Sequence, residues 1–158
     1  MGCAVWVASD EKGKSYEDFV FAEHTLAEFP SVGLEPESRD LVRTIDVLWI
    51  RGNKIEAAFE VEVTTSIFSG LLRMSDLVSL QPNITFDLFI VAPDERASTV
   101  RRQVLRPTFE GFDPPLRKRC RYLSASKLGE AVTKTAPLKG YVNPKAINEF
   151  AEEVRVSI

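Results

Sequence analysis

Hydrophobic and polar residues alternate strictly along the run IEAAFEVEV, residues 55–63, and this period is typical of a β-strand. Its apolar side chains share one face, whereas Glu60 and Glu62 share the other. The β-branched and aromatic run TIDVLWI, residues 44–50, predicts a second strand. The polar RGNK segment between the runs predicts a turn, so the two strands are expected to form an antiparallel hairpin.

The hydrophobic period changes to that of a helix after Val63. Apolar residues at positions 67, 71, 74 and 78 form one stripe, Thr64 or Thr65 is a candidate N-cap, and residues 81–83 (QPN) end the helix. The other predicted elements are a strand at 3–9, a polar turn at 10–14, a short helix around 25–29, a loop at 31–40, a buried strand at 86–92, a helix from 93, an edge strand at 119–124, and helices at 125–134 and 144–154.

This order predicts an α/β fold with a mixed sheet, in which an antiparallel meander is joined to a parallel strand and helices flank both sides. The helix between residues 63 and 86 is a candidate right-handed crossover. A length of 158 residues suits one domain, residues 1–158.

Composition narrows the classes of protein. Hydrophobic residues make up 44% and charged residues 27% of the chain, as in ordinary soluble domains. No apolar run approaches the ~20 residues of a membrane span, and no signal-peptide pattern is present, so a cytoplasmic protein without a membrane partner is expected. Cys3 and Cys120 lack metal-ligand spacing, and His24 is the only histidine, which argues against a Cys- or His-rich metal site.

The two glutamates become part of a candidate metal site if Asp46 lies next to them. A two-residue hairpin loop would pair Asp46 with Phe59, whereas a three-residue loop, residues 52–54, pairs Asp46 with Glu60 and brings three carboxylates together. Such carboxylates repel one another unless a cation is bound, and Mg²⁺ prefers oxygen ligands, to which the Val61 carbonyl could be added. The alternative is that the glutamates form the solvated face of an amphipathic strand.

Asp46 followed by Glu60-Val61-Glu62 at a strand end before a helix resembles the PD-(D/E)xK nuclease superfamily, which has the restriction endonuclease-like fold. The longer run from DVLWIRGNKIEAAFEVEV onward is similar to bacterial proteins described only as restriction endonuclease-like. The resemblance implies Mg²⁺-dependent hydrolysis of DNA, with Mn²⁺ as a substitute. It implies that Asp46 and Glu60 bind metal and that Glu62 positions or deprotonates the attacking water.

Two departures from the superfamily pattern qualify this expectation. Lysine usually stands where this chain has Glu62, although restriction enzymes with an ExE variant are similar and still cleave DNA. The first core helix of the superfamily is not visible before Cys3, which leaves open that the chain lacks this helix and is a fragment of a longer one.

Charge is distributed unevenly around a net value of −3. Residues 1–62 contain 13 acidic and 6 basic side chains, a balance of −7, whereas residues 96–121 contain 8 basic and 2 acidic ones, a balance of +6. A basic segment of this kind is a candidate for phosphate contact, and a solubilising surface is the alternative. The candidate nucleic-acid-binding residues are Thr65, Ser66, Arg73, Arg101, Arg102, Arg117, Lys118 and Arg119.

Two classes of function therefore stay open. The first is a Mg²⁺-dependent DNA endonuclease or a domain of one, in which Asp46, Glu60 and Glu62 are catalytic. The second is a catalytically inactive nuclease-like fold that binds DNA or joins a protein complex, as a homodimer or with a partner subunit.

Overall fold

The structure is a computed structural model, and it describes residues 2–16, 18–63, 66–138 and 141–156. Its elements in chain order are β1 (Ala4–Val7), α1 (Ser9–Lys12), β2 (Ser15–Tyr16), β3 (Phe19–Val20), α2 (Phe21–His24), α3 (Pro36–Val42), β4 (Val47–Arg51), β5 (Lys54–Val61), α4 (Ile67–Leu80), β6 (Asp87–Ala92), the 3₁₀ helix η1 (Asp94–Arg96), α5 (Ala97–Val104), α6 (Pro107–Glu110), η2 (Leu116–Lys118), β7 (Cys120–Ser124), α7 (Ala125–Thr135), η3 (Ala136–Leu138), η4 (Pro144–Glu149) and β8 (Glu152–Glu153).

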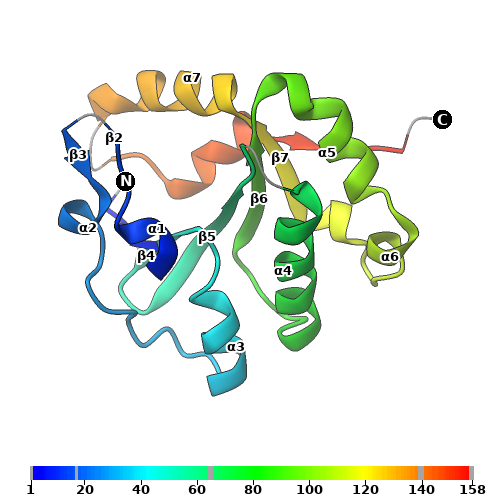
Figure 1. Ribbon diagram of the computed structural model, residues 1–158, viewed down its shortest axis with the longest axis horizontal. Coiled ribbons are helices and arrows are strands. Elements are labelled where there is room, and N and C mark those ends of the chain that lie inside the picture. Colours follow the sequence, from blue (N-terminus) through cyan, green and yellow to red (C-terminus); the bar gives the residue numbers. More distant parts are fainter. Residues whose placement is uncertain (1, 17, 64–65, 139–140, 157–158) are drawn as a thin grey trace.

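A six-stranded sheet in the order β1-β4-β5-β6-β7-β8 organises the molecule (Figure 1). β1, β4 and β5 form an antiparallel meander, β5, β6 and β7 are parallel, and β8 pairs antiparallel with β7. The mixed α/β sheet predicted from the sequence is therefore confirmed. Within the described residues, no helix combines the length and apolar character needed to cross a membrane.

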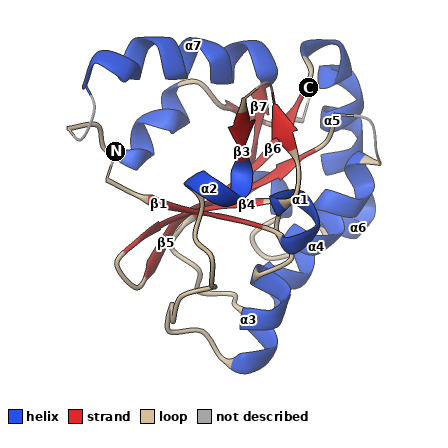
Figure 2. Ribbon diagram, turned by 60° about the vertical axis from the view of Figure 1, so that its left-hand side comes forward, coloured by secondary structure: helices blue, strands red, loops and turns tan. Residues whose placement is uncertain are grey.

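Helices cover both faces of the sheet, as Figures 1 and 2 show from two directions. On one face, apolar side chains of α3, α4 and α5 pack with the sheet residues Leu48, Ala58 and Ile90. On the other face, α7 and η4 pack against a smaller cluster around Phe59 and Phe89, whose rings stack. Because α4 links parallel β5 to β6, it lies directly over the face of β5 that carries the glutamates.

Five local predictions were wrong. The segment 10–14 is not only a turn, because α1 occupies Ser9–Lys12, and the helix expected around 25–29 lies earlier, as α2. The predicted loop at 31–40 contains the start of α3, whose first turn holds a proline that suits this position. β7 is not the edge strand, because the chain end predicted as helical forms η4 and then β8, which pairs outside β7.

The hairpin of β4 and β5 reaches the expected register by another route. Its loop has two residues, Gly52 and Asn53, between the paired Arg51 and Lys54, rather than the three predicted. Gly52 has φ +61°, which suits a tight hairpin turn. An irregularity between Trp49 and Ile50 then shifts the pairing by one residue. Leu48 consequently pairs with Ala58, as the three-residue loop had predicted.

A long insertion separates the first two strands of the meander. It contains α1, the small β2–β3 hairpin, α2 and α3 before the chain returns to β4. In Figure 2, α1 and α2 lie in front of the strands rather than within the sheet. The backbone of this insertion is tied to the meander, because Leu26 N–H donates to the Val5 carbonyl at 2.8 Å. The insertion therefore forms a wall beside the end of β5.

Candidate active site

Asp46 and Glu60 are brought together by the register of β4 and β5. Asp46 directly precedes β4, and the last pair of the ladder at this end of the hairpin is Val47 with Phe59, so the next position along faces Glu60. The Asp46 carboxylate accepts a hydrogen bond from the Val61 backbone N–H, with 2.8 Å between N and Oδ2. The ladder of the hairpin thus positions the first carboxylate against the strand that carries the second.

Glu60 is a buried carboxylate, with 0% of its side chain exposed. Arg73, from the middle of α4, binds it with two groups: Nε donates to Oε1 at 2.8 Å and Nη2 donates to Oε2. Burial raises the pKa of Glu60 from 4.5 to about 8, although the hydrogen bonds and charge of Arg73 oppose this rise. The pKa of Arg73 is raised in turn, chiefly by its hydrogen bonds with Glu60, so the guanidinium stays charged.

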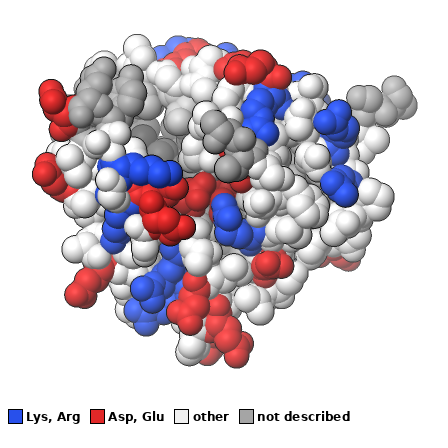
Figure 3. Space-filling view, in the orientation of Figure 1, with Lys and Arg blue, Asp and Glu red and all other residues white. Residues whose placement is uncertain are grey.

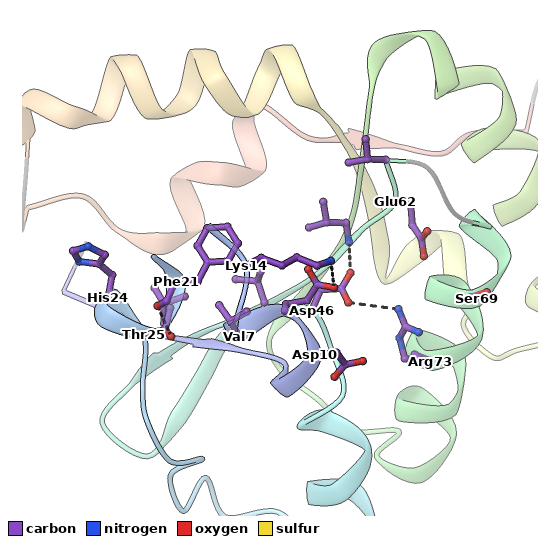
Figure 4. Close-up of a pocket in the computed structure, with 15 residues that line it drawn as sticks. Val7, Asp10, Lys14, Phe21, His24, Thr25, Asp46, Glu62, Ser69 and Arg73 are labelled. Atoms are coloured by element: carbon purple, nitrogen blue, oxygen red, sulfur yellow. Dashed lines mark hydrogen bonds and ion pairs between the residues drawn. The ribbon is translucent and has the colours of Figure 1, made fainter. Parts of the chain in front are cut away.

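The same guanidinium also faces Asp46. Arg73 Nη2 lies 3.7 Å from Asp46 Oδ1, so one cation stands against both carboxylates (Figure 4). The pKa of Asp46 is raised, first by burial, while its hydrogen bond from Val61 and the charge of Arg73 act in the opposite direction. Asp46 and Glu60 therefore form a desolvated acidic pair whose charge is balanced inside the protein by an arginine.

Glu62 is held apart from this pair by α4. Its side chain is buried, and its Oε1 accepts a hydrogen bond of 3.1 Å from the backbone N–H of Gly70. A Cβ at Gly70 would lie 2.7 Å from Glu62 Oε1 and 3.1 Å from the Glu60 Cβ. Only glycine therefore lets α4 approach both glutamates this closely. Gly70 was not among the predicted site residues, although a glycine on the apolar stripe of a helix is a recognisable signal.

The expected convergence of three carboxylates is reduced to a pair. Throughout the part of the chain that the structure describes, no group of three or more His, Cys, Asp or Glu side chains is arranged to hold a metal ion. Asp46 and Glu60 meet, whereas Glu62 is turned toward α4. Val61, the other predicted metal ligand, is the last residue of β5 and is partly exposed beside them. The pair can offer carboxylate oxygens to a cation only if Arg73 moves away from Glu60.

A cleft of about 720 Å³ opens over these residues. One side is formed by α4 and by the ends of β4 and β5, including Asp46, Glu62 and Arg73, and the other side belongs to the insertion. Acidic side chains gather in the middle of this face of the molecule, between α1 and α4 (Figure 3). Sequence reasoning missed the contribution of the insertion, whose cleft-lining residues are Asp10, Glu11, Lys14, Phe21, His24 and Thr25.

The predicted nucleic-acid-binding residues do not form one group. Thr65 lies outside the described residues, while Ser66 is the exposed N-cap position of α4, its side chain making no capping hydrogen bond. Arg73 lines the cleft, but Arg101 and Arg102 belong to α5 and Arg117 and Lys118 to η2, with Arg119 after it. Arg101 pairs with Glu152 and Arg117 with Glu110, and Arg119 donates to the Pro82 carbonyl.

Comparison with known proteins relates the chain to restriction enzymes. The Type II restriction enzyme NmeDI of Neisseria meningitidis serogroup C is 31% identical over 125 residues, which are 72% of this chain. The match covers 34% of that enzyme, so the chain spans about a third of its length. No solved structure matches the chain. The model of the family described as the Type II restriction enzyme NmeDI C-terminal domain matches residues 1–154, and the chain belongs to this family.

Proposed function

We propose that the chain is a nuclease domain that hydrolyses phosphodiester bonds of DNA with the help of Mg²⁺. The observation that carries the proposal is the pair formed by buried Glu60 on β5 and by Asp46, whose side chain is 20% exposed, beside a cleft. Desolvated carboxylates are rarely retained for stability alone, and perturbed pKa values in a cleft are a mark of functional sites. The relationship to a Type II restriction enzyme supports the same conclusion.

The acidic pair fits a divalent cation in its chemistry. Its carboxyl groups have raised pKa values, and a cation is already needed to balance them, a position that Arg73 fills in the folded chain. Mg²⁺ is commonly held by one or two carboxylates together with substrate phosphate and water, so a third carboxylate is not required. Asp46, Glu60 and the Val61 carbonyl are the proposed ligands. When bound, Mg²⁺ would lower the pKa of a coordinated water and neutralise charge on the phosphate.

The protein's own groups would supply the proton transfer and the positioning. Glu62 lines the cleft, and it is the proposed acceptor of the proton from the attacking water once its carboxylate turns from the Gly70 N–H toward the acidic pair. The water oxygen would bond to phosphorus while the bond from phosphorus to the leaving sugar oxygen breaks. The leaving oxygen takes a proton from solvent, giving one phosphomonoester end and one hydroxyl end. Arg73, displaced from Glu60, would be within the same cleft to contact the phosphate.

Two measurements test this proposal. The chain is expected to nick supercoiled plasmid in Mg²⁺ or Mn²⁺, and Asp46→Asn or Glu60→Gln should reduce the rate at least about 100-fold, because each removes a metal-binding carboxylate. Mn²⁺ binding, followed by the loss of its free-ion electron paramagnetic resonance signal, should weaken in both variants and strengthen in Arg73→Gln. If the wild-type chain shows no cleavage and no Mn²⁺ binding, the proposal is contradicted.

A catalytically inactive DNA-binding module is the second candidate, and one observation favours it. Arg73 already balances the acidic pair, so the folded chain is electrostatically complete without metal. This candidate predicts salt-dependent DNA binding that persists unchanged in Asp46→Asn and Glu60→Gln, without cleavage in either metal. The nicking and binding assays on the same variants therefore separate the two candidates.

A further inference from the structure

The cleft needs positive charge on more than one side if it is to hold a phosphodiester. Asp10, Glu11, Asp46 and Glu62 all line it, and Glu60 lies buried beside them. A phosphate entering this space would meet carboxylates from both the insertion and the meander. Opposing charges therefore decide which part of the cleft a phosphate can occupy.

Among the described residues that line the cleft, Lys14 and Arg73 are the lysine and arginine side chains. They stand on opposite walls, because Arg73 comes from α4 and Lys14 from the turn between α1 and β2. Arg73 is bound to the fully buried Glu60 through two nitrogen atoms. Releasing it without a replacement cation would leave a buried carboxylate uncompensated, which is strongly unfavourable.

Lys14 is held in place by its backbone while its side chain is accessible. Its N–H donates to the Glu11 carbonyl at 3.0 Å, and its own carbonyl accepts from Phe21 N–H at 3.3 Å, which closes the base of the β2–β3 hairpin. The side chain is 60% exposed and reaches toward Asp46 (Figure 4). Hydrogen bonding with Glu11 raises the pKa of Lys14, and the nearby charges of Glu11, Asp46 and Asp10 act in the same direction, so it stays protonated.

The partner of Lys14 can be exchanged easily. Its Nζ lies 2.6 Å from Glu11 Oε1, and both side chains of this pair are at least a third exposed. An exposed ion pair of this type contributes little to stability, so a phosphate oxygen can replace Glu11 without leaving a buried charge behind. The two cations of the cleft thus differ: Lys14 is available in the folded chain, whereas Arg73 becomes available only when another cation binds Glu60.

We propose that Lys14 is a phosphate-binding residue of the cleft, which contacts a non-bridging oxygen of the DNA backbone before any metal is bound. This inference rests on the proposed function, because it assumes that DNA phosphate enters the cleft. It assigns to the insertion, rather than to β5 or α4, the first positive contact made by the substrate.

The test measures binding of a fluorescein-labelled 30-base-pair duplex to the full chain in EDTA, at several salt concentrations. Lys14→Met is expected to weaken binding about 3- to 10-fold at 100 mM salt and to reduce the slope of log affinity against log salt by about 1. Lys134→Met is the matched control. Lys134 on α7 is 63% exposed and pairs with Glu130 at the same 2.6 Å, but it does not line the cleft.

Two further results make the outcome decisive. Glu11→Gln should bind the duplex more tightly than the wild type, because it removes the carboxylate that competes for Lys14. The inference is overturned if Lys14→Met binds the duplex as tightly as the wild type, or loses no more affinity than Lys134→Met. Either result leaves the proposed nuclease function intact. If the wild-type chain shows no salt-dependent binding of the duplex, both DNA binding and the role of Lys14 are overturned. If binding depends on Lys14 but no metal-dependent cleavage occurs, only the proposed nuclease activity is overturned.

Discussion

The acidic cleft and the basic segment 96–121 are both groups of like charge, but they differ in how their charges are buried and paired. In the cleft, Glu60 and Glu62 are buried, and Arg73 is shared between Glu60 and Asp46. In the basic segment, the charges are spread over α5, η2 and β7. Their pairs range from exposed, as for Arg101 with Glu152 at 48% and 50% exposed, to half-buried, as for Arg117 with Glu110 at 19% and 27% exposed.

The contrast shows that a segment with net positive charge in the sequence does not necessarily form a continuous positive surface in the folded chain. Arg117 is paired with Glu110, and Arg121 lies 3.8 Å from Glu153 on β8. Arg102 and Lys118 are exposed, and Figure 3 shows Lys and Arg side chains over α5 on the same face as the acidic cleft. The buried carboxylates are the more specific signal, because burial of charge is costly and must be compensated.

Removing one partner from each region should give the largest difference. Arg73→Met leaves Glu60 buried without its cation, and the free energy of unfolding is expected to fall by about 2–3 kcal/mol. Arg101→Met breaks an exposed pair and should cost at most about 1 kcal/mol. Urea denaturation at pH 9, above the pKa of about 8 at which Glu60 loses its proton, measures both. Equal losses would contradict the contrast between the two regions, and Arg73→Met combined with Glu60→Gln should recover part of the first loss.

The raised pKa of Glu60 predicts a pH dependence of stability. Between 4.5, its ordinary value, and about 8, the folded chain holds the Glu60 proton more tightly than the unfolded chain does. The free energy of unfolding should therefore decrease as the pH rises, by about 2 kcal/mol from pH 6 to pH 8. The raised pKa of Asp46 acts in the same direction. The Glu60→Gln side chain cannot titrate, so the denaturation midpoint of this variant should vary less with pH. A pH profile identical to that of the wild type would contradict Glu60 as the origin of the pH dependence.

Two helical glycines distinguish the crowded site from an open surface. Gly70→Ala places a Cβ against Glu62 and Glu60 and should destabilise the chain by about 1–2 kcal/mol, despite the better helix propensity of alanine. Gly129 on α7 has no atom within 4 Å of its added Cβ, so Gly129→Ala should stabilise by about 0.5–1 kcal/mol. Thermal melts of both variants provide the test. A stabilising Gly70→Ala would mean that α4 does not approach the glutamates this closely.

The smallest effects are expected from the exposed cations of the basic segment. Arg102→Gln and Lys118→Gln should each weaken duplex binding about 2- to 3-fold. The slope of log affinity against log salt should fall by about 1 if the side chain contacts phosphate. Their melting temperatures should stay within a degree or two of the wild type, because both side chains are exposed. An unchanged slope in both variants would remove the basic segment from the proposed DNA interface and leave only the cleft.

Part of the candidate site was visible in the sequence because it depends on strand period and register. Alternation placed Glu60, on β5, and Glu62, just after it, on one face, and the paired position of Asp46 follows from Leu48 lying opposite Ala58. The reason proposed for that register was wrong, since a bulge and a two-residue loop replace the three-residue loop. Local sequence favours both solutions, and only packing of the whole hairpin selects one.

What the sequence by itself determined was the type of each main element and the face on which its carboxylates lie, because period 2 and period 3.6 are properties of neighbouring residues. Tertiary structure decided the partners. The pairing of Arg73 with Glu60, the close approach of α4 at Gly70 and the position of Lys14 across the cleft each join separate elements. Such contacts depend on how the elements pack, and no local spacing along the chain specifies them.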